Sequence, residues 1–166
     1  MRPDLDEILV VTESAIRQAC RDSVRVDPTI QIFGARDGEV AVLPFGWRND
    51  RERSAVLTAL RSTLRFVDTV AYAIAHEVWV TAVDDRGLMP DQPSVVMQGD
   101  RPDRHEALMI LVVARSGAKK AQMFEIKRDD AGMMVDLVLD KLWSATMDLD
   151  GELTRLFEPA HVAGPE

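Results

Sequence analysis

Two His-Glu pairs are the residues of this sequence best suited to chemistry. His76-Glu77 stands in the run AHEVWV, and His105-Glu106 stands in the run RHEALMILVV. Imidazole and carboxylate groups are common ligands of zinc and non-haem iron, and they are common partners in general acid–base catalysis. If the four side chains converged, they would form the site of a small metal-dependent hydrolase.

Strand geometry limits that convergence. Both pairs adjoin apolar runs typical of β-strands, in which successive side chains point to opposite faces. One face therefore gathers only two of the four groups, such as His76 with Glu106 or His76 with His105, depending on register. A metal site needs three or four ligands, and the third would come from acidic residues of the intervening loop: Asp84, Asp85 or Asp103. We expect no metal and no cofactor, and the catalytic candidates remain these four residues.

A structural role is the competing interpretation of the same region. A half-buried carboxylate at the end of a strand is tolerated when an arginine pairs with it, because guanidinium geometry matches two carboxylate oxygens. We therefore expect an ion-pair cluster of Glu77, Arg104 and Glu106 that ties the 83–103 loop to the edge of the sheet.

The same strand ends carry a motif: Glu77-x-Trp79, then a Pro-rich loop, then Pro102-Asp103-Arg104-x-Glu106-Ala107-Leu108. This pattern, within about residues 68–128, resembles one found in small uncharacterised bacterial and phage-type proteins. The resemblance implies one polar cluster around Glu77, Arg104 and Glu106, and it implies no particular activity.

The hydrophobic pattern predicts the elements that position these residues. Helical spacing indicates an amphipathic helix over 4–22 and a second helix that Asn49 caps, with Glu52 three residues later completing a capping box. Alternating apolar residues indicate a hairpin at 29–45, a long strand over about 70–80 and a three-strand meander within 106–139. A short helix is expected near the C-terminus.

This order, α-β-β-α-β-β-β-β-α, predicts an α+β fold. We expect an antiparallel sheet of about five or six strands with the helices packed on one face. The expected organisation is a single domain over residues 1–158 and a flexible C-terminal tail at 159–166.

Composition excludes several classes of protein. The chain has 166 residues, of which 46% are hydrophobic and 29% charged, as in ordinary globular domains. Its net charge of -8 argues against nucleic acid as a partner. Its longest apolar run, about eight residues, is far shorter than the roughly 20 that span a bilayer. The lone Cys20 excludes an intrachain disulfide, and these features together predict a cytoplasmic protein. Sixteen arginines against four lysines suggest a bacterial source.

The segment 83–103 is predicted to be a long surface loop. Its apolar residues suit contacts with a partner or a second subunit: Met89, Val95, Val96 and Met97. The leading hypothesis is thus a non-enzymatic interaction or assembly protein that forms a homodimer. The alternatives are the metal-dependent hydrolase and a small-molecule-binding α/β sandwich, since the small side chains of VAYAIA leave room for a cavity.

Overall fold

A computed structural model of the chain describes residues 4–21, 23–35, 38–81, 104–141 and 151–158. The helices and strands occur in this order: α1 (Leu5–Cys20), β1 (Thr29–Gly34), β2 (Gly38–Pro44), α2 (Asp50–Phe66), β3 (Thr69–Thr81), β4 (Arg104–Ala114), β5 (Lys119–Arg128), β6 (Met134–Asp140) and η1 (Glu152–Thr154). The α+β class and the order of the elements are confirmed. The expected C-terminal helix is only the single 3-10 turn η1.

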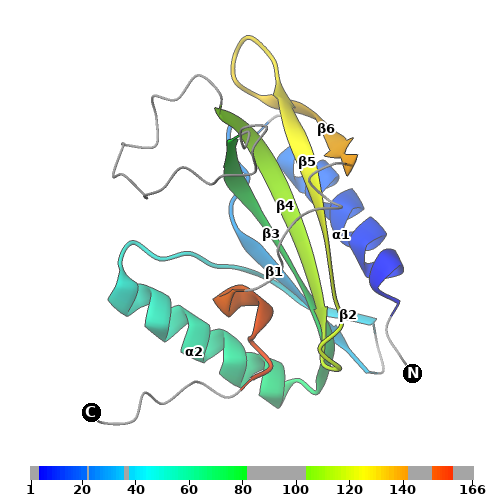
Figure 1. Cartoon of the computed structure of the whole chain (residues 1–166), viewed down its shortest axis with the longest axis vertical. Coiled ribbons are helices and arrows are strands. Elements are labelled where there is room, and N and C mark those ends of the chain that lie inside the picture. Colours follow the sequence, from blue (N-terminus) through cyan, green and yellow to red (C-terminus); the bar gives the residue numbers. More distant parts are fainter. Residues whose placement is uncertain (1–3, 22, 36–37, 82–103, 142–150, 159–166) are drawn as a thin grey trace, which may run out of the picture.

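The six strands form one antiparallel sheet in the order β2-β1-β3-β4-β5-β6 (Figure 1). The long strands β3 and β4 form its centre and pair without a break from Ala71 opposite Ala114 to Thr81 opposite Arg104. β1 and β2 extend the sheet on the β3 side, and β5 and β6 extend it on the β4 side. The sheet therefore grows outward from one central antiparallel pair.

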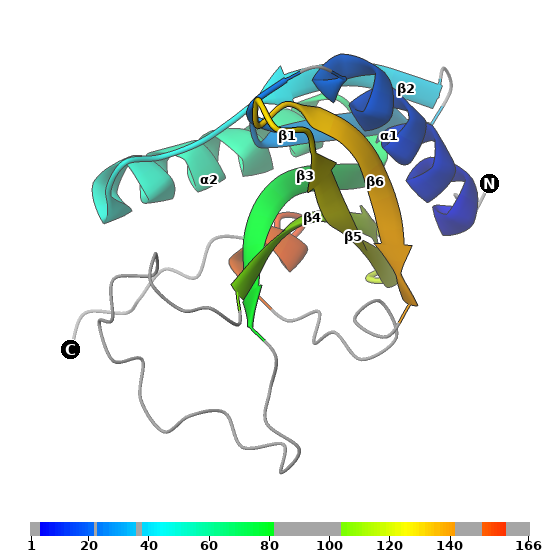
Figure 2. The same ribbon diagram turned by 90° about the horizontal axis from the view of Figure 1, so that it is seen from above.

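The two helices lie on opposite faces of this sheet, so the prediction that they pack on one face was wrong (Figure 2). Ala71, Ala73 and Ala75 of β3 belong to the hydrophobic cluster beneath α1, whereas Tyr72 and Ile74 belong to the cluster beneath α2. A strand that is apolar at every position buries both faces and needs a covering layer on each. The run VAYAIA carries this signal.

Helix α1 is joined to the sheet by both packing and polar contacts. Asp4 caps its first turn by accepting the Asp6 N–H at 2.9 Å. In the buried interface, the Thr12 hydroxyl donates to the Gln31 side-chain oxygen of β1 at 2.8 Å. Because both groups are almost fully buried, each satisfies the hydrogen bond that the other would otherwise lose.

Side chains cover part of the exposed backbone edge of the outer strand β6. The Leu137 N–H donates to the Asp136 carboxylate at 2.7 Å, and the Leu137 carbonyl accepts a hydrogen bond from the Arg17 guanidinium. Arg17 also binds the Asp136 carboxylate at 2.8 Å. An edge strand exposes backbone groups that invite another strand, and these side chains occupy those groups at Leu137.

Helix α2 begins largely as its sequence predicts. Asn49 accepts the Glu52 N–H at 3.0 Å, which confirms the cap. The Glu52 carboxylate reaches back to the Arg48 N–H at 2.9 Å, one residue before the position that a capping box would use. Leu57, Leu60 and Leu64 then form the buried stripe of the helix. Within the described residues, no helix has the length and apolar character needed to cross a membrane.

The C-terminal segment 151–158 packs on the same face as α2. The Tyr72 hydroxyl, buried in the sheet, donates to the Leu153 carbonyl at 2.7 Å and accepts the Leu156 N–H at 3.3 Å. Leu156 is completely buried, and the Phe157 ring lies against the Tyr72 ring with centroids 5.0 Å apart. This attachment places η1 beside α2 and above the central strands.

Candidate functional site

The central strands separate the His-Glu residues onto two faces. Trp79 pairs in register with Glu106, and Glu77 pairs with Leu108, so Glu77 and Glu106 lie on the α1 face. His76 lies on the other face, where it borders a cavity with Leu57 of α2. The structure thus joins the two glutamates and places His76 apart from them. The backbone of His105 pairs with Val80, and its side chain lies outside the described residues.

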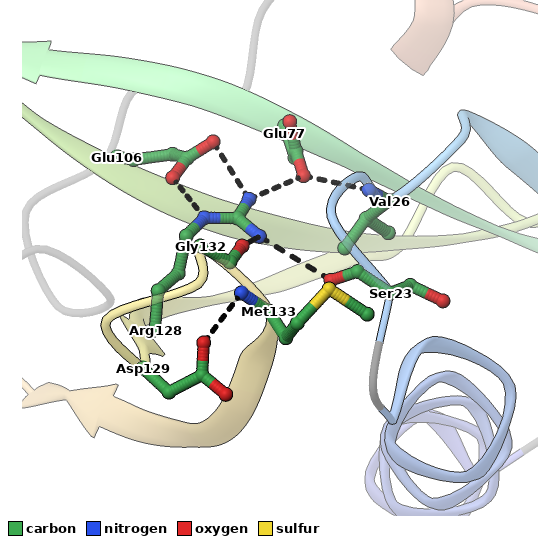
Figure 3. Close-up of polar contacts among 8 residues, drawn as sticks. All are labelled: Ser23, Val26, Glu77, Glu106, Arg128, Asp129, Gly132 and Met133. Carbon is green, nitrogen blue, oxygen red and sulfur yellow. Dashed lines mark hydrogen bonds and ion pairs between the residues drawn. The ribbon is translucent and has the colours of Figure 1, made fainter.

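Arg128, at the end of β5, binds both glutamates (Figure 3). Its Nε donates to one Glu106 oxygen at 2.7 Å, and its Nη2 donates to the other at 2.9 Å. The same Nη2 donates to Glu77 Oε1 at 3.1 Å. All three side chains are mostly buried, with exposed fractions of 18% for Arg128, 21% for Glu77 and 24% for Glu106. We call these three residues the Arg128 cluster.

The Arg128 cluster also holds the connection between α1 and β1. Glu77 Oε1 accepts the Val26 N–H at 2.6 Å. Arg128 Nη1 donates to the Ser23 carbonyl at 3.5 Å and to the Gly132 carbonyl at 3.2 Å. The cluster therefore joins the connection at residues 23–26, the strands β3, β4 and β5, and the β5–β6 turn.

The β5–β6 turn has the sequence features that place Arg128 correctly. The Asp129 side chain accepts the N–H groups of Ala131 and Met133, both at 2.9 Å. Gly132 adopts a φ of 79°, a left-handed conformation that glycine tolerates without strain. This tight turn brings the Gly132 carbonyl back to the Arg128 guanidinium.

Electrostatic interactions in the Arg128 cluster favour the charged forms of Glu106 and Arg128. The hydrogen bonds from Arg128 lower the pKa of Glu106, against the opposing effect of burial. The hydrogen bond to Glu106 raises the pKa of Arg128. A carboxylate kept ionised and occupied by a guanidinium is a poor general acid and a poor metal ligand. The chemistry of this cluster is structural.

The ion-pair hypothesis named Glu77 and Glu106, but it named Arg104 as their partner. The Arg104 side chain lies outside the described residues, so its contribution stays a prediction. Arg128 was missed although the sequence contains its signal. The turn between β4 and β5, at Arg115–Gly117, sets a register with Ala107 opposite Glu125, which makes Arg128 a diagonal neighbour of Glu106 on the same face.

On the opposite face, His76 borders a cavity of about 290 Å³ between the central strands, α2 and the η1 segment. The lining residues are Trp47, Arg53, Leu57, His76, Met109, Leu111, Gly151, Glu152, Leu153 and Thr154. We call this space the His76 cavity. Its walls come from four separate parts of the chain, which is why the sequence alone did not indicate it.

Only one of the two ring nitrogens of His76 has a hydrogen-bonding partner among the described residues. Its Nδ1 lies 3.2 Å from the Glu77 carbonyl oxygen, whereas its Nε2 is buried and has no hydrogen-bonding partner among the described residues. Burial lowers the pKa of His76, and the hydrogen bond to the Glu77 carbonyl opposes this effect. Burial therefore favours the neutral imidazole of His76, and Nε2 is enclosed by protein rather than exposed to the cavity.

The charged residues that border the His76 cavity are paired with each other. Arg53 of α2 forms an ion pair with Glu152 of η1, and its guanidinium lies 5.9 Å from the centre of the Trp47 ring. The remaining walls are mostly apolar, including Leu57, Met109 and Leu111. Mostly apolar cavities of this kind are typical of small-ligand sites.

Metal and thiol chemistry find little support in the described part of the chain. Within it, no three His, Cys, Asp or Glu side chains lie close enough to hold a metal ion. Asp84, Asp85 and Asp103 lie outside the described residues. Cys20 is buried in the core beneath α1, and burial raises the pKa of its thiol, which disfavours the reactive thiolate.

Removing the guanidinium of the Arg128 cluster should destabilise the fold. We expect Arg128→Met to lower the free energy of unfolding by about 3 kcal/mol, because two half-buried carboxylates lose their partner. The matched control is Arg48→Met, whose 87% exposed guanidinium pairs with Glu52 and should contribute no more than about 0.5 kcal/mol. Urea unfolding of both variants measures the difference. Equal losses in the two variants would contradict the role of Arg128.

Acid should weaken the cluster through Glu106. Its folded-state pKa lies below the ordinary value of 4.5, so its contribution is present above pH 4.5 and disappears as pH falls through the lowered pKa. We expect the unfolding free energy of Glu106→Gln to fall less steeply than that of the wild type between about pH 5 and pH 3. In an Arg128→Met background the same substitution should leave the slope nearly unchanged. A wild-type slope in Glu106→Gln would refute this assignment.

Comparisons with known proteins add no family to this picture. No family model, curated protein or solved structure matches the chain. The resemblance of residues 68–128 to small bacterial and phage-type proteins therefore stays a prediction, and the function has to be inferred from the geometry of the site.

Proposed function

We propose that this chain is a binding protein and that the His76 cavity holds a small ligand. The observation that carries the proposal is the His76 cavity itself, a preformed space of about 290 Å³ with mostly apolar walls that include Leu57, Met109 and Leu111. Apolar walls of this kind favour a mostly apolar ligand, because its binding removes apolar surface from water.

The size and composition of the cavity support the proposal. Its volume of about 290 Å³ lies close to the lower limit of the range of roughly 300–1,000 Å³ found for ligand sites. Apolar side chains such as Leu57 and Leu111 are held in place by the core beneath α2. A ligand would thus meet preformed walls and lose little binding energy in ordering them.

The glutamates give independent support for binding over hydrolysis. The hydrolase alternative uses His76, Glu77, His105 and Glu106 together. In the structure Glu77 and Glu106 bind Arg128 on the α1 face, and His76 borders the cavity on the α2 face. A binding site needs only the His76 side of the sheet.

Filling the cavity should abolish binding. Indole is a suitable probe, because it is a compact and mostly apolar molecule. We expect NMR titration of the wild type to show saturable shifts of the Leu57 and Leu111 methyl signals. Met109→Phe, which adds a ring at the cavity wall, should lose these shifts. Val11→Phe adds the same ring at a 44% exposed position on α1 and should bind as the wild type does. Undiminished binding by Met109→Phe, or no saturable binding by the wild type, would refute the proposal.

A homodimeric interaction protein is the second candidate, and the exposed Phe66 is the observation that favours it. Phe66, at the end of α2, is 92% exposed. Three residues before it, Thr63 borders an apolar groove of about 460 Å³ that also contains Phe45 and Leu60. In a two-fold dimer, the Phe66 ring of each subunit would enter the groove of the other. The loop residues Met89, Val95, Val96 and Met97 lie outside the described residues, so their role in a dimer stays a prediction.

Sedimentation measurements test the dimer. The wild-type mass should rise toward that of a dimer with concentration, and Phe66→Asp should remain monomeric because a carboxylate cannot enter an apolar groove without a large desolvation cost. Val135→Asp, at a 55% exposed position on β6, is the matched control and should dimerise normally. A wild type that stays monomeric at all concentrations would exclude this candidate.

A further inference from the structure

The C-terminal segment 151–158 lies on the protein in the way that a bound peptide does. Its regular structure is the single 3-10 turn η1, and within the described residues none of the six strands pairs with it. Its turns are closed locally: the Arg155 N–H donates to the Glu152 carbonyl at 3.2 Å, and the Glu158 N–H donates to the Arg155 carbonyl at 3.1 Å. Side chains anchor the segment to α2 and to the sheet.

Two adjacent side chains of the segment are its main apolar anchors. Leu156 is completely buried in the hydrophobic cluster beneath α2. The Phe157 ring lies against the Tyr72 ring, and the Arg115 guanidinium lies 5.6 Å from the centre of the Phe157 ring. Leu153, three residues before Leu156, packs against the same cluster. Apolar residues at positions i, i+3 and i+4 are the anchors by which short helical peptides dock on other proteins.

The polar contacts recognise the backbone and the charge of the segment. The Tyr72 hydroxyl donates to the Leu153 carbonyl at 2.7 Å and accepts the Leu156 N–H at 3.3 Å. It therefore binds two backbone groups that every residue except proline offers. Arg53 of α2 forms an ion pair with Glu152 at the start of the segment. We call the residues that make these contacts the Tyr72 surface: Arg53, Tyr72 and Arg115.

Little buried surface holds the segment in place. Leu156 is its one fully buried side chain among the described residues, and the Arg53–Glu152 pair is 43% and 53% exposed. The segment also leaves the His76 cavity unfilled beside Gly151–Thr154, so it covers this face of the protein incompletely. Segments with few buried apolar contacts open at a lower free energy than the central strands of a sheet. Another peptide can therefore take the place of this segment.

We propose that the Tyr72 surface is a docking site for a peptide segment of a partner protein, and that residues 151–158 occupy it in the absence of that partner. The partner segment carries the pattern Glu152-Leu153-x-x-Leu156-Phe157: an acidic residue and a leucine, then a leucine and an aromatic residue. Because the chain's own segment is tethered, it competes at a high effective concentration, and a partner has to bind more tightly than it does. This inference goes beyond the proposed function, since it requires no ligand in the His76 cavity.

A fluorescently labelled peptide with the sequence of residues 151–158, GELTRLFE, tests the surface. We expect it to bind the full-length Leu156→Asp variant at least about tenfold more tightly than the wild type, because the variant's own segment no longer competes. Val138→Asp, at a 43% exposed position on β6, introduces the same charge and should bind the peptide as weakly as the wild type does. Fluorescence anisotropy measures the affinities. A folded Leu156→Asp variant that binds the peptide no more tightly than the wild type would overturn the proposal.

A second peptide and a second measurement complete the test. A peptide with the Leu156→Asp substitution should not bind the variant chain, and equal binding of the two peptides would contradict recognition through this anchor. If the Leu156→Asp chain does not fold, hydrogen exchange of the wild type decides the question. The Leu156 N–H should then have a protection factor at least about 100-fold below that of Leu111 in β4. Equal protection would show that the segment leaves only when the whole domain unfolds, and it would overturn the proposal. Indole binding tests the His76 cavity separately, so either proposal can fail without the other.

Discussion

The side-chain alternation of the long β3–β4 pair is the constraint on which the structure depends. Because successive residues of a strand point to opposite faces, Ala73 and Ile74 enter two different hydrophobic clusters. Each face must then be covered, by α1 on one side and by α2 with the C-terminal segment on the other. The same alternation separates His76 from Glu77, so that adjacent residues take part in unrelated structures on the two faces.

The small residues of β3 adjust the spacing of the layers. Ala71, Ala73 and Ala75 lie beneath α1, where they allow the helix to approach the sheet closely. Tyr72 faces the other layer, and its hydroxyl binds the backbone of the C-terminal segment. The large side chain of Tyr72 therefore lies where the C-terminal segment 151–158 is attached to the sheet. Burial raises the pKa of Tyr72, which keeps its hydroxyl protonated and able to donate to Leu153.

Much of the fold could be predicted from the sequence, because its signals are local. The caps at Asp4 and Asn49 and the turn at Asp129–Gly132 act within a few residues. The apolar run VAYAIA indicates that both faces of the sheet are covered, but the apolar stripe of a helix does not reveal which face it meets, so the two helices were wrongly placed on one face. The C-terminal helix was overestimated, since Gly151 and Pro159 leave too short a stretch for several helical turns. Of the Arg128 cluster, only the two glutamates were identified; the arginine required the strand register to be followed across a hairpin. The His76 cavity could not be predicted, because Trp47, Arg53 and Gly151 meet only in the folded chain.

His76 interrupts an apolar pattern on the α2 face of β3. Its neighbours on the same face of β3, Ile74 and Val78, are apolar, and a third apolar residue between them would satisfy the strand pattern. Histidine instead introduces a buried nitrogen, Nε2, that has no hydrogen-bonding partner among the described residues. The Arg128 cluster on the opposite face holds the same segment of β3 through Glu77, one residue away, with hydrogen bonds to β5 and to the α1–β1 connection. The hydrogen bonds of Glu77 therefore stabilise the segment of β3 that contains His76. The two residues of the His-Glu pair thus take part in separate structures: Glu77 holds the strand through its hydrogen bonds on the α1 face, and His76 lines the cavity on the α2 face.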